Sequence, residues 1–385
     1  MESQTIGNLM EFGQEIVDSA RFAYERRYRA LLEDGSPDAM RELKLQMGRD
    51  GFCGMTIPHE YGGMELPLLT TLRVTQLFQV CDARLGGLSH RFNTGPMGAV
   101  AALAPEPLRR RYVMPLCRGE LSMAIGISEP EAGSAATAMR TRARISGDEV
   151  IINGSKTFVS NVADSECTLL YCRFSDSGSP KDIGAIILPH DAPGLTISGF
   201  RNMADETQHQ MFMDDCRVPL DHVVVQSNAF GRLIRHYNGE RLGSVARMLG
   251  NAEFCLGYAI NYIKERKQFG RELADFQGLQ WMIAEMKVKL DAAQLLTYRA
   301  AANAHGEEAD PLETSIAKVY VSQAAKEICD DALQLLGGYG YMVEFPIEHR
   351  LRETRGGAIY GGTAQIHKNM IAGHLLGRSN SQWKR

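Results

Sequence analysis

The spacing of hydrophobic residues divides the chain into three parts. Up to about residue 120, apolar side chains recur every three or four positions, as in FGQEIVDSARFAYERRYRALL, which is typical of amphipathic helices. From residue 121 to about 225, short β-rich runs such as EVIINGSKTFVS and CTLLYCRF are separated by Gly, Asp, Ser and Pro clusters, a pattern that predicts an antiparallel sheet. Long helical patterns then return. We therefore expect a helical domain over 1–120, a β domain over 121–225 and a helical domain over 226–385.

Length and composition fit this plan and narrow the classes of function. The 385 residues are enough for two or three domains, and the formal charge of -4 is spread along the chain, which disfavours a nucleic-acid or polybasic membrane protein. The eight Cys form no CxxC pair and the ten His form no HxxxH or HExxH pair, so we expect reduced thiols and no metal site. The absence of a membrane-spanning run and of a targeting peptide leads us to expect a cytoplasmic protein acting on a small molecule.

Glycine clusters occur in the last fifty residues of the sequence, at Gly337-Gly338 and at Gly361-Gly362. Glycine permits positive φ and a close approach of backbone to a ligand, but helix caps and turns explain these clusters equally well. Neither a phosphate loop nor the glycine fingerprint of a dinucleotide-binding βαβ unit is present. Pattern and composition therefore leave the function open.

Several motifs carry more information. They are SMAIGISEPEAGSAA (122–136), NGSKTFVSN (153–161), ERKQFG (265–270) and GGYGY (337–341), supported by GFCGMTIPHEYGG (51–63) and IYGGTAQI (359–366). The order and spacing of these motifs resemble those of the acyl-CoA dehydrogenase family. The resemblance implies a mainly α fold with a central β domain: an N-terminal helical domain, a middle β-barrel or sandwich and a C-terminal four-helix bundle. It also implies FAD, held between the β domain and the last bundle, and a homotetramer built as a dimer of dimers.

The resemblance assigns residues to the flavin. Ile125, Ile127 and Ser128 correspond to contacts with the pyrimidine edge, where backbone amides and a hydroxyl favour the reduced ring. The segment beside the isoalloxazine corresponds to Phe158, Val159 and Ser160, with Phe158 where Trp is common. Contacts to a neighbouring subunit's FAD correspond to Arg266, Phe269, Gln277, Gln334, Gly337 and Gly338, and those near the adenosine pyrophosphate of the subunit's own FAD to Thr363 and Gln365. Arg266 has an alternative role as a solvated charge in the last turn of a helix.

Oxidation of an acyl thioester removes the α-proton to a base and the β-hydrogen as a hydride to the flavin, so a carboxylate must face the flavin across the substrate. Most relatives place a Glu in a Tyr-Glu-Gly-Thr segment, which here reads Tyr360-Gly361-Gly362-Thr363. The N–H of Gly361 can still donate to the thioester carbonyl. A branch that includes isovaleryl-CoA dehydrogenase-like and long-chain members supplies the base from an earlier helix, one residue before an Arg. Glu240 is therefore the expected base, and the alternative is an exposed acid in the first turn of a helix.

Further residues resemble contacts to the acyl-CoA. The CoA and thioester side corresponds to Ser134, Tyr237, Asn238, Arg241 and Gly362. Arg241 has an equally good structural alternative, an ion pair with a nearby carboxylate. Arg91, beside His90, is unusual next to an aliphatic tail, because an unpaired buried guanidinium would cost several kcal/mol. It either pairs with a polar or anionic acyl group or points to solvent or an interface.

These assignments predict an FAD-dependent acyl-CoA dehydrogenase that passes electrons to an electron-transfer flavoprotein. A redox-neutral enzyme such as a 3-sulfinopropionyl-CoA desulfinase, in which Gln replaces the base and an Arg binds the sulfinate, is the second hypothesis. Here those positions hold Glu240 and Gly87, which favours a dehydrogenase. An enoyl-CoA reductase on the same scaffold and a catalytically silent flavoprotein or assembly partner complete the range of functions that the sequence allows.

Overall fold

A computed structural model describes residues 9–304 and 308–377 of the chain. These residues pack into two compact units, each with its own buried hydrophobic cluster. Of these residues, the helical unit combines 9–27, Pro67–His90, 241–304 and 308–377, and the sheet unit combines Tyr28–Leu66 with Arg91–Glu240. Helices from the first third of the sequence contribute to both units, so domain limits at residues 121 and 226 stay a prediction.

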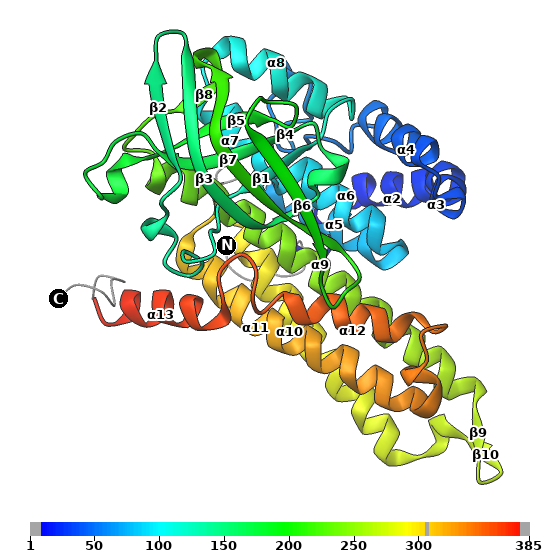
Figure 1. The fold of residues 1–385 in the computed structure, drawn as a ribbon. Coiled ribbons are helices and arrows are strands. Elements are labelled where there is room, and N and C mark those ends of the chain that lie inside the picture. The colour runs from blue at the N-terminus through cyan, green and yellow to red at the C-terminus, as the bar shows by residue number, and fades with distance from the viewer. Residues whose placement is uncertain (1–8, 305–307, 378–385) are drawn as a thin grey trace, which may run out of the picture. The chain divides into compact units, whose positions relative to one another are not determined.

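The sheet unit is built on eight strands, visible in green in Figure 1. Their order is β6-β7-β3-β2-β4-β5-β8, and β1 pairs with β4. Their bounds are β1 (Met123–Gly126), β2 (Arg142–Ser146), β3 (Glu149–Ser160), β4 (Cys167–Arg173), β5 (Ile183–Pro189), β6 (Leu195–Arg201), β7 (Thr207–Pro219) and β8 (Val223–Val225). The pairs β1–β4 and β2–β4 are parallel and the others antiparallel. The sheet is therefore mixed rather than antiparallel throughout, because the long connection from β1 to β4 lets these strands run in the same direction.

The core of the sheet unit lies on the central strands. Every residue of β4 is buried, and so are all residues of β5 except Pro189, which explains why CTLLYCR and IGAIILP read as almost continuous apolar runs. Four helices complete this unit: α3 (Arg29–Asp34), α4 (Pro37–Arg49), α7 (Pro96–Leu103) and α8 (Glu106–Cys117). The end of α4 approaches the end of α8 so closely that a Cβ on Gly48 would lie 2.2 Å from the carbonyl oxygen of Arg118.

The helical unit contains most of the long helices. They are α2 (Gln14–Ala23), α5 (Leu68–Cys81), α10 (Gln277–Ala302), α11 (Pro311–Leu336), α12 (Pro346–Gly356) and α13 (Ala364–Leu375). Two more, α6 (Ala83–Thr94) and α9 (Phe230–Glu265), begin or end in the sheet unit. Figure 1 shows α10 and α11 side by side, and apolar residues of α9, α10 and α11 such as Leu249, Leu290 and Val321 form one buried cluster. No helix among the described residues is both long and apolar enough to cross a membrane.

A charged pair lies inside the sheet unit. Lys156 of β3 is fully buried, and its Nζ donates to Oε1 of Glu129 at 2.9 Å and to the carbonyl oxygen of Ile127 at 3.0 Å. Glu129 also accepts the backbone N–H groups of Arg140 and Thr141, at 2.6 and 2.9 Å. This pair ties the segment that follows β1 to the middle of the sheet.

We predict that Lys156→Met destabilises the protein by about 3–5 kcal/mol, because the Glu129 carboxylate then stays buried without its cation. The double variant Lys156→Met/Glu129→Gln should regain much of this loss, since it removes both charges. Urea unfolding of the wild type, both single variants and the double variant measures the coupling. A double variant that loses the sum of the two single losses would show that the pair is not coupled.

Candidate active site

Strand β1 and the segment that follows it present three predicted flavin contacts. Ile125, Ile127 and Ser128 are each half-buried, whereas their neighbours Gly126 and Glu129 are buried. The carbonyl of Ile127 accepts from Lys156, and that of Ser128 accepts from the N–H of Thr157 at 2.9 Å. The backbone is thus held from the sheet side, and the three side chains keep an accessible face.

The electrostatics of the buried pair behind this segment favour the carboxylate form of Glu129. Burial raises the pKa of the Glu129 carboxyl, but the Lys156 ammonium and the donated N–H groups outweigh it and hold that pKa below its usual value. Burial also lowers the pKa of Lys156, while Glu129 opposes this shift. The result is a fixed dipole that orients the backbone at residues 127–129.

Phe158 has an unusual backbone. It has a φ of 56°, is 66% exposed and sits where the pairing of β3 with β7 shifts register between Lys156 and Val159. A positive φ is rare for an aromatic residue and marks strain, which concentrates at functional sites. Its ring and that of Phe200 form a T-shaped pair with centroids 5.7 Å apart and an interplanar angle of 75°. The bulge therefore presents an aromatic face outward, as a ring-stacking residue requires.

The neighbours of Phe158 divide between the two faces of β3. Val159 is 1% exposed and packs in the sheet core, so only its backbone remains for a ligand. Ser160 is exposed, and its hydroxyl donates to Oε1 of Gln208 at 2.9 Å. Arg91 lies next to this segment, with Nη2 2.5 Å from Oδ1 of Asn161 and 3.8 Å from Asp164. Arg91 thus has partners within the sheet unit.

The helical unit carries a hairpin between α9 and α10. Its strands are β9 (Lys267–Gln268) and β10 (Arg271–Glu272), and both loop residues, Phe269 and Gly270, have positive φ, as a type I′ turn requires. Asn or Gly is usual there, yet Phe269 occupies the loop and is 93% exposed. The turn displays this ring to its surroundings.

Arg266 and the Gly337 loop lie together in the helical unit. The Arg266 guanidinium lies 5.7 Å from the centroid of the Tyr339 ring, just beyond the end of α9. Gly337 has φ 60° and ψ −135°, and among the described residues no heavy atom lies within 4 Å of a Cβ built on Gly337 or Gly338. Gln334 on α11 and Gln277 at the start of α10 are exposed. Arg266 and the glycine loop form an open cationic cradle, which side chains at Gly337 and Gly338 would fill.

The Gly361 turn is held by two side chains. Nε of Arg241 donates to the Gly361 carbonyl oxygen at 2.8 Å, and Nε2 of His367 lies 3.2 Å from the same atom. Arg241 therefore donates to a backbone carbonyl. This role differs from the two that the sequence suggested, a CoA contact and an ion pair. Gly361 and Gly362 have φ values of 69° and 96°, which favour glycine.

A buried ammonium lies beneath the same turn. Lys318 is fully buried, its Nζ donates to Oγ of Ser244 at 3.0 Å, and it lies 4.7 Å from the centroid of the Tyr360 ring. A Cβ on Gly361 would lie 3.5 Å from this Nζ. The turn thus lies among cationic groups, which favour negative charge on a molecule bound there.

His367 is neutral at physiological pH. Burial, with the nearby Arg241 and Lys318 charges, lowers its pKa to about 4. A carbonyl oxygen only accepts hydrogen bonds, so Nε2 must carry the proton that faces Gly361. Nδ1 lies 3.0 Å from the hydroxyl of Ser315.

The remaining predicted residues lie on α13, α9 and a loop. Thr363 is the N-cap of α13, where its hydroxyl accepts from the N–H of Ile366 at 3.2 Å, and Gln365 is exposed in the first turn. Glu240 and Tyr237 are half-buried on α9, while Asn238 is 1% exposed. Because α9 begins at Phe230, Glu240 belongs to its third turn, and an exposed first-turn acid does not describe it. Ser134 is exposed in the loop before residues 136–138.

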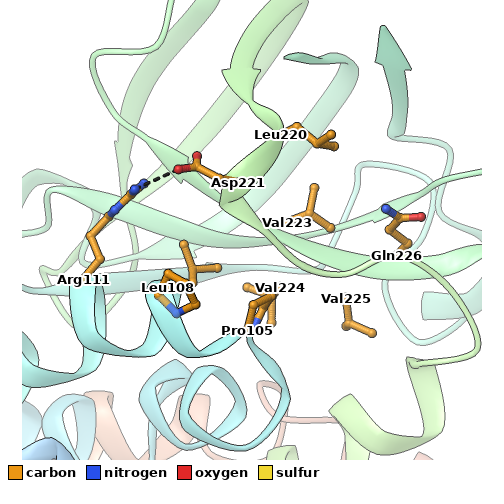
Figure 2. A pocket seen from close by; sticks show the side chains of 10 residues that line it. Pro105, Leu108, Arg111, Leu220, Asp221, Val223, Val224, Val225 and Gln226 are labelled. Carbon is orange, nitrogen blue, oxygen red and sulfur yellow. Dashed lines mark hydrogen bonds and ion pairs between the residues drawn. The ribbon is translucent and has the colours of Figure 1, made fainter. Parts of the chain in front are cut away.

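A cavity of about 330 Å³ in the sheet unit lies apart from these residues. Figure 2 shows α8 and the segment around β8 lining it, with the Arg111 guanidinium 2.8 Å from the Asp221 carboxylate. None of the predicted site residues lines this cavity.

Sequence reasoning missed four residues that support the site. Glu129 and Lys156 stand within motifs already recognised, but nothing in the sequence of the mixed polar and apolar strand EVIINGSKTFVS marked its Lys as buried. His367 follows the Gly-Gly-Thr segment closely, but its contacts depend on how α13 packs. Lys318 gave no signal, because one Lys on a helix normally faces solvent.

Comparison with known proteins identifies the family. The models described as acyl-CoA dehydrogenase N-terminal, middle and C-terminal domains match residues 11–120, 124–216 and 230–376. The 3-sulfinopropanoyl-CoA desulfinase of Paraburkholderia xenovorans (strain LB400) is 35% identical over 90% of this chain and 88% of that protein. The caffeyl-CoA reductase-Etf complex subunit CarC of Acetobacterium woodii is 32% identical over 87% of this chain and 90% of that protein. The butyryl-CoA dehydrogenase structure from Megasphaera elsdenii has a TM-score of 0.87 and 25% sequence identity, and the match covers 94% of this chain and 98% of that one.

The fold and these matches define a flavoprotein with a helical, a β-sheet and a second helical domain. The chain belongs to the acyl-CoA dehydrogenase family. The predicted fold class is thereby confirmed. FAD is the cofactor of this family, and the strained exposed Phe158 and the open glycine cradle beside Arg266 fit such a group.

We predict that His367 makes the protein sensitive to acid. Its pKa rises from about 4 in the folded protein towards about 6.5 on unfolding, so stability is present above pH 6.5 and is lost as the pH falls towards 4. The loss should amount to about 3 kcal/mol. In His367→Gln, the free energy of unfolding from urea titrations should change less between pH 7 and pH 4, by about this amount. His374→Gln, at an exposed site on the same helix, is the matched control, and equal pH dependence in wild type and His367→Gln would contradict the prediction.

Proposed function

We propose that this protein is an FAD-dependent acyl-CoA dehydrogenase in which Glu240 removes the α-proton of the thioester. The observation that carries the proposal is the hydrogen bond from Arg241 to Gly361. It joins the residue that follows Glu240 in α9 to the turn where most relatives carry their catalytic Glu. The turn at Gly361 lacks the usual carboxylate. Glu240 provides one from α9, directly before Arg241, which holds this turn.

The residues divide the chemistry between them. When bound, FAD supplies the acceptor for the β-hydride. The Glu240 carboxylate takes the α-proton, and the N–H of Gly361 donates to the thioester carbonyl oxygen, where negative charge develops. Arg241 and Lys318 add positive charge beside the turn, which favours the enolate. Glycine at position 361 leaves this wall without a second base.

A second function on the same scaffold has specific support. The similar proteins include a desulfinase and a reductase subunit, so a redox-neutral or reductive acyl-CoA enzyme is the alternative. The CarC relative belongs to a complex with Etf, and we propose an electron-transfer flavoprotein as the acceptor here. Anaerobic addition of acyl-CoAs should bleach the flavin of a dehydrogenase, whereas elimination without redox change leaves it oxidised and releases product.

We propose a homotetramer, built as a dimer of dimers. Trp281, Val288 and Leu295 of α10 are 61%, 70% and 38% exposed. They are seven residues apart and therefore form one apolar stripe along the helix. Phe269 adds an exposed aromatic ring beside the start of α10. A second copy that covers this stripe would bury it and bring Arg266 and Phe269 to the neighbouring cofactor.

We predict that Glu240→Gln slows anaerobic flavin reduction by an acyl-CoA by about 10²–10⁴-fold, because an amide cannot accept the α-proton. Stopped-flow absorbance of the bound flavin measures this rate. Glu285→Gln, at an exposed site on α10, is the matched control. Flavin reduction at the normal rate in Glu240→Gln would exclude Glu240 as the base.

The double variant Glu240→Gln/Gly361→Glu tests the position of the base. A Cβ at residue 361 meets only ordinary contacts, at 3.5 Å or more, although the φ of 69° adds strain of about 1–2 kcal/mol. We expect part of the flavin reduction rate to return, because a carboxylate again stands at the usual place of the family. If the double variant reduces its flavin no faster than Glu240→Gln, residues 240 and 361 do not serve the same proton.

We predict that Arg266→Ala binds FAD about tenfold or more weakly, because a charge-assisted contact to the pyrophosphate is lost. The flavin-to-protein absorbance ratio after purification and a titration of the apoprotein with FAD measure this change. Lys267→Ala, in the same hairpin, controls for loss of a positive charge alone. Full retention of FAD in Arg266→Ala would overturn the assignment.

A further inference from the structure

Gly87 on α6 leaves an accessible space beside a guanidinium. Gly87 is half-buried, and among the described residues only Nη2 and Cζ of Arg247 lie within 4 Å of a Cβ built on it, at 3.8 and 3.9 Å. Its neighbour Gly86 differs, because a Cβ there would lie 2.1 Å from Oε1 of Gln79. Gly86 therefore serves helix packing, whereas Gly87 opens a space in which Arg247 of α9 presents its guanidinium.

The orientation of Arg247 is fixed by a buried polar network. Its Nε donates to Oε1 of Gln79 at 3.2 Å, and its Nη2 donates to Oε1 of Glu353. Asn251 donates to Oε2 of Glu353 at 3.1 Å, and Arg350 donates to Oδ1 of Asn251 at 2.8 Å. These five side chains contain two guanidinium groups and one carboxylate. The network thus holds the Arg247 guanidinium rigidly and carries an excess of positive charge.

Arg247 is still within reach of a ligand. Its side chain is 17% exposed, whereas the Glu353 side chain is 8% exposed. A guanidinium has five N–H donors in a rigid plane, so one group can serve a protein carboxylate and a ligand at the same time. Because the protein has already oriented this group, little entropy is lost when a second partner binds.

The position of Arg247 along α9 relates it to the proposed base. Arg247 follows Glu240 by seven residues, which places their Cα atoms on one face of the helix about 10.5 Å apart. Gly243 lies between them on that face and contributes no side chain. An acyl chain that begins at Glu240 can thus extend along this face of α9 towards Arg247.

We propose that Arg247 determines acyl specificity by binding a carboxylate at the distal end of the acyl group of an acyl-CoA. The proposal rests on the proposed function, because Glu240 marks the reacting end of the acyl chain. A planar guanidinium matches the two oxygens of a carboxylate. An aliphatic end would displace water from the charged network beside Gly87 without replacing its hydrogen bonds, which is unfavourable.

Unreactive CoA thioethers test tail recognition without turnover. S-(4-carboxybutyl)-CoA and S-pentyl-CoA have the same number of tail carbons and differ only in the distal carboxylate. Calorimetric titration of the holoenzyme should show that the carboxylate form binds about tenfold or more tightly. In Arg247→Met this preference should disappear, while affinity for S-pentyl-CoA changes by no more than about twofold. Arg232→Met, at an exposed site on the same helix, should keep the wild-type preference.

Each outcome has a distinct meaning. An equal preference in wild type and Arg247→Met overturns the role of Arg247 and leaves the proposed function intact. Failure of both thioethers to bind the wild type contradicts the proposed function itself. Loss of the preference in Arg91→Met alone would assign the tail to Arg91 and overturn the proposal. Arg247→Lys keeps a cation beside Glu353, so it serves as the test if Arg247→Met does not purify as folded protein.

Moving the guanidinium provides a positive test. In Gly87→Arg/Arg247→Ala, the guanidinium comes from α6 instead of α9 and enters the space that Arg247 has left. We expect the preference for the carboxylate to return to within about tenfold of wild type. Arg247→Ala alone should show none, and a double variant that stays without preference although it is folded and binds S-pentyl-CoA would contradict a site at Gly87.

Discussion

The hydrogen bond from Arg241 to the carbonyl oxygen of Gly361 is the constraint on which the thioester end of the site depends. A turn of two glycines with positive φ has no side chains of its own to fix it, so its shape must come from outside. Arg241 and His367 provide this from one side, and Lys318 lies against Tyr360 from another. The buried charges cost desolvation energy, and in return the N–H groups of the turn keep one direction.

The sheet unit uses the same device in another form. There the ammonium of Lys156 bonds to a backbone carbonyl after β1, and Glu129 collects N–H groups from residues 140 and 141. In both units a buried ionic group orients main chain that has small or aliphatic side chains. Catalysis by preorganised backbone donors needs such support, because a flexible loop would reorganise as charge develops.

Hydrophobic periodicity and the family motifs predicted the three-part fold, since helices and strands of this length repeat their apolar positions faithfully. The motifs also named the strand and hairpin segments that carry Phe158 and Phe269. They did not show that Val159 faces the core while Phe158 turns outward, because one bulge reverses the alternation of a strand. Nor did they reveal Lys318, His367 or Arg247, each of which has at least one partner on a helix distant in sequence. Such contacts depend on helix packing, which local pattern does not encode.

The hairpin with Phe269 at its tip links assembly to cofactor retention. Because the Phe269 ring is 93% exposed, it contributes favourable burial free energy only when another surface covers it. In the proposed tetramer the covering surface belongs to the neighbour, and the same hairpin brings Arg266 to that neighbour's FAD. Binding of FAD and association of subunits then share one equilibrium, in which each raises the apparent affinity of the other by the same factor. Dilution of the protein would thus weaken its hold on the flavin without any change in the residues that touch it.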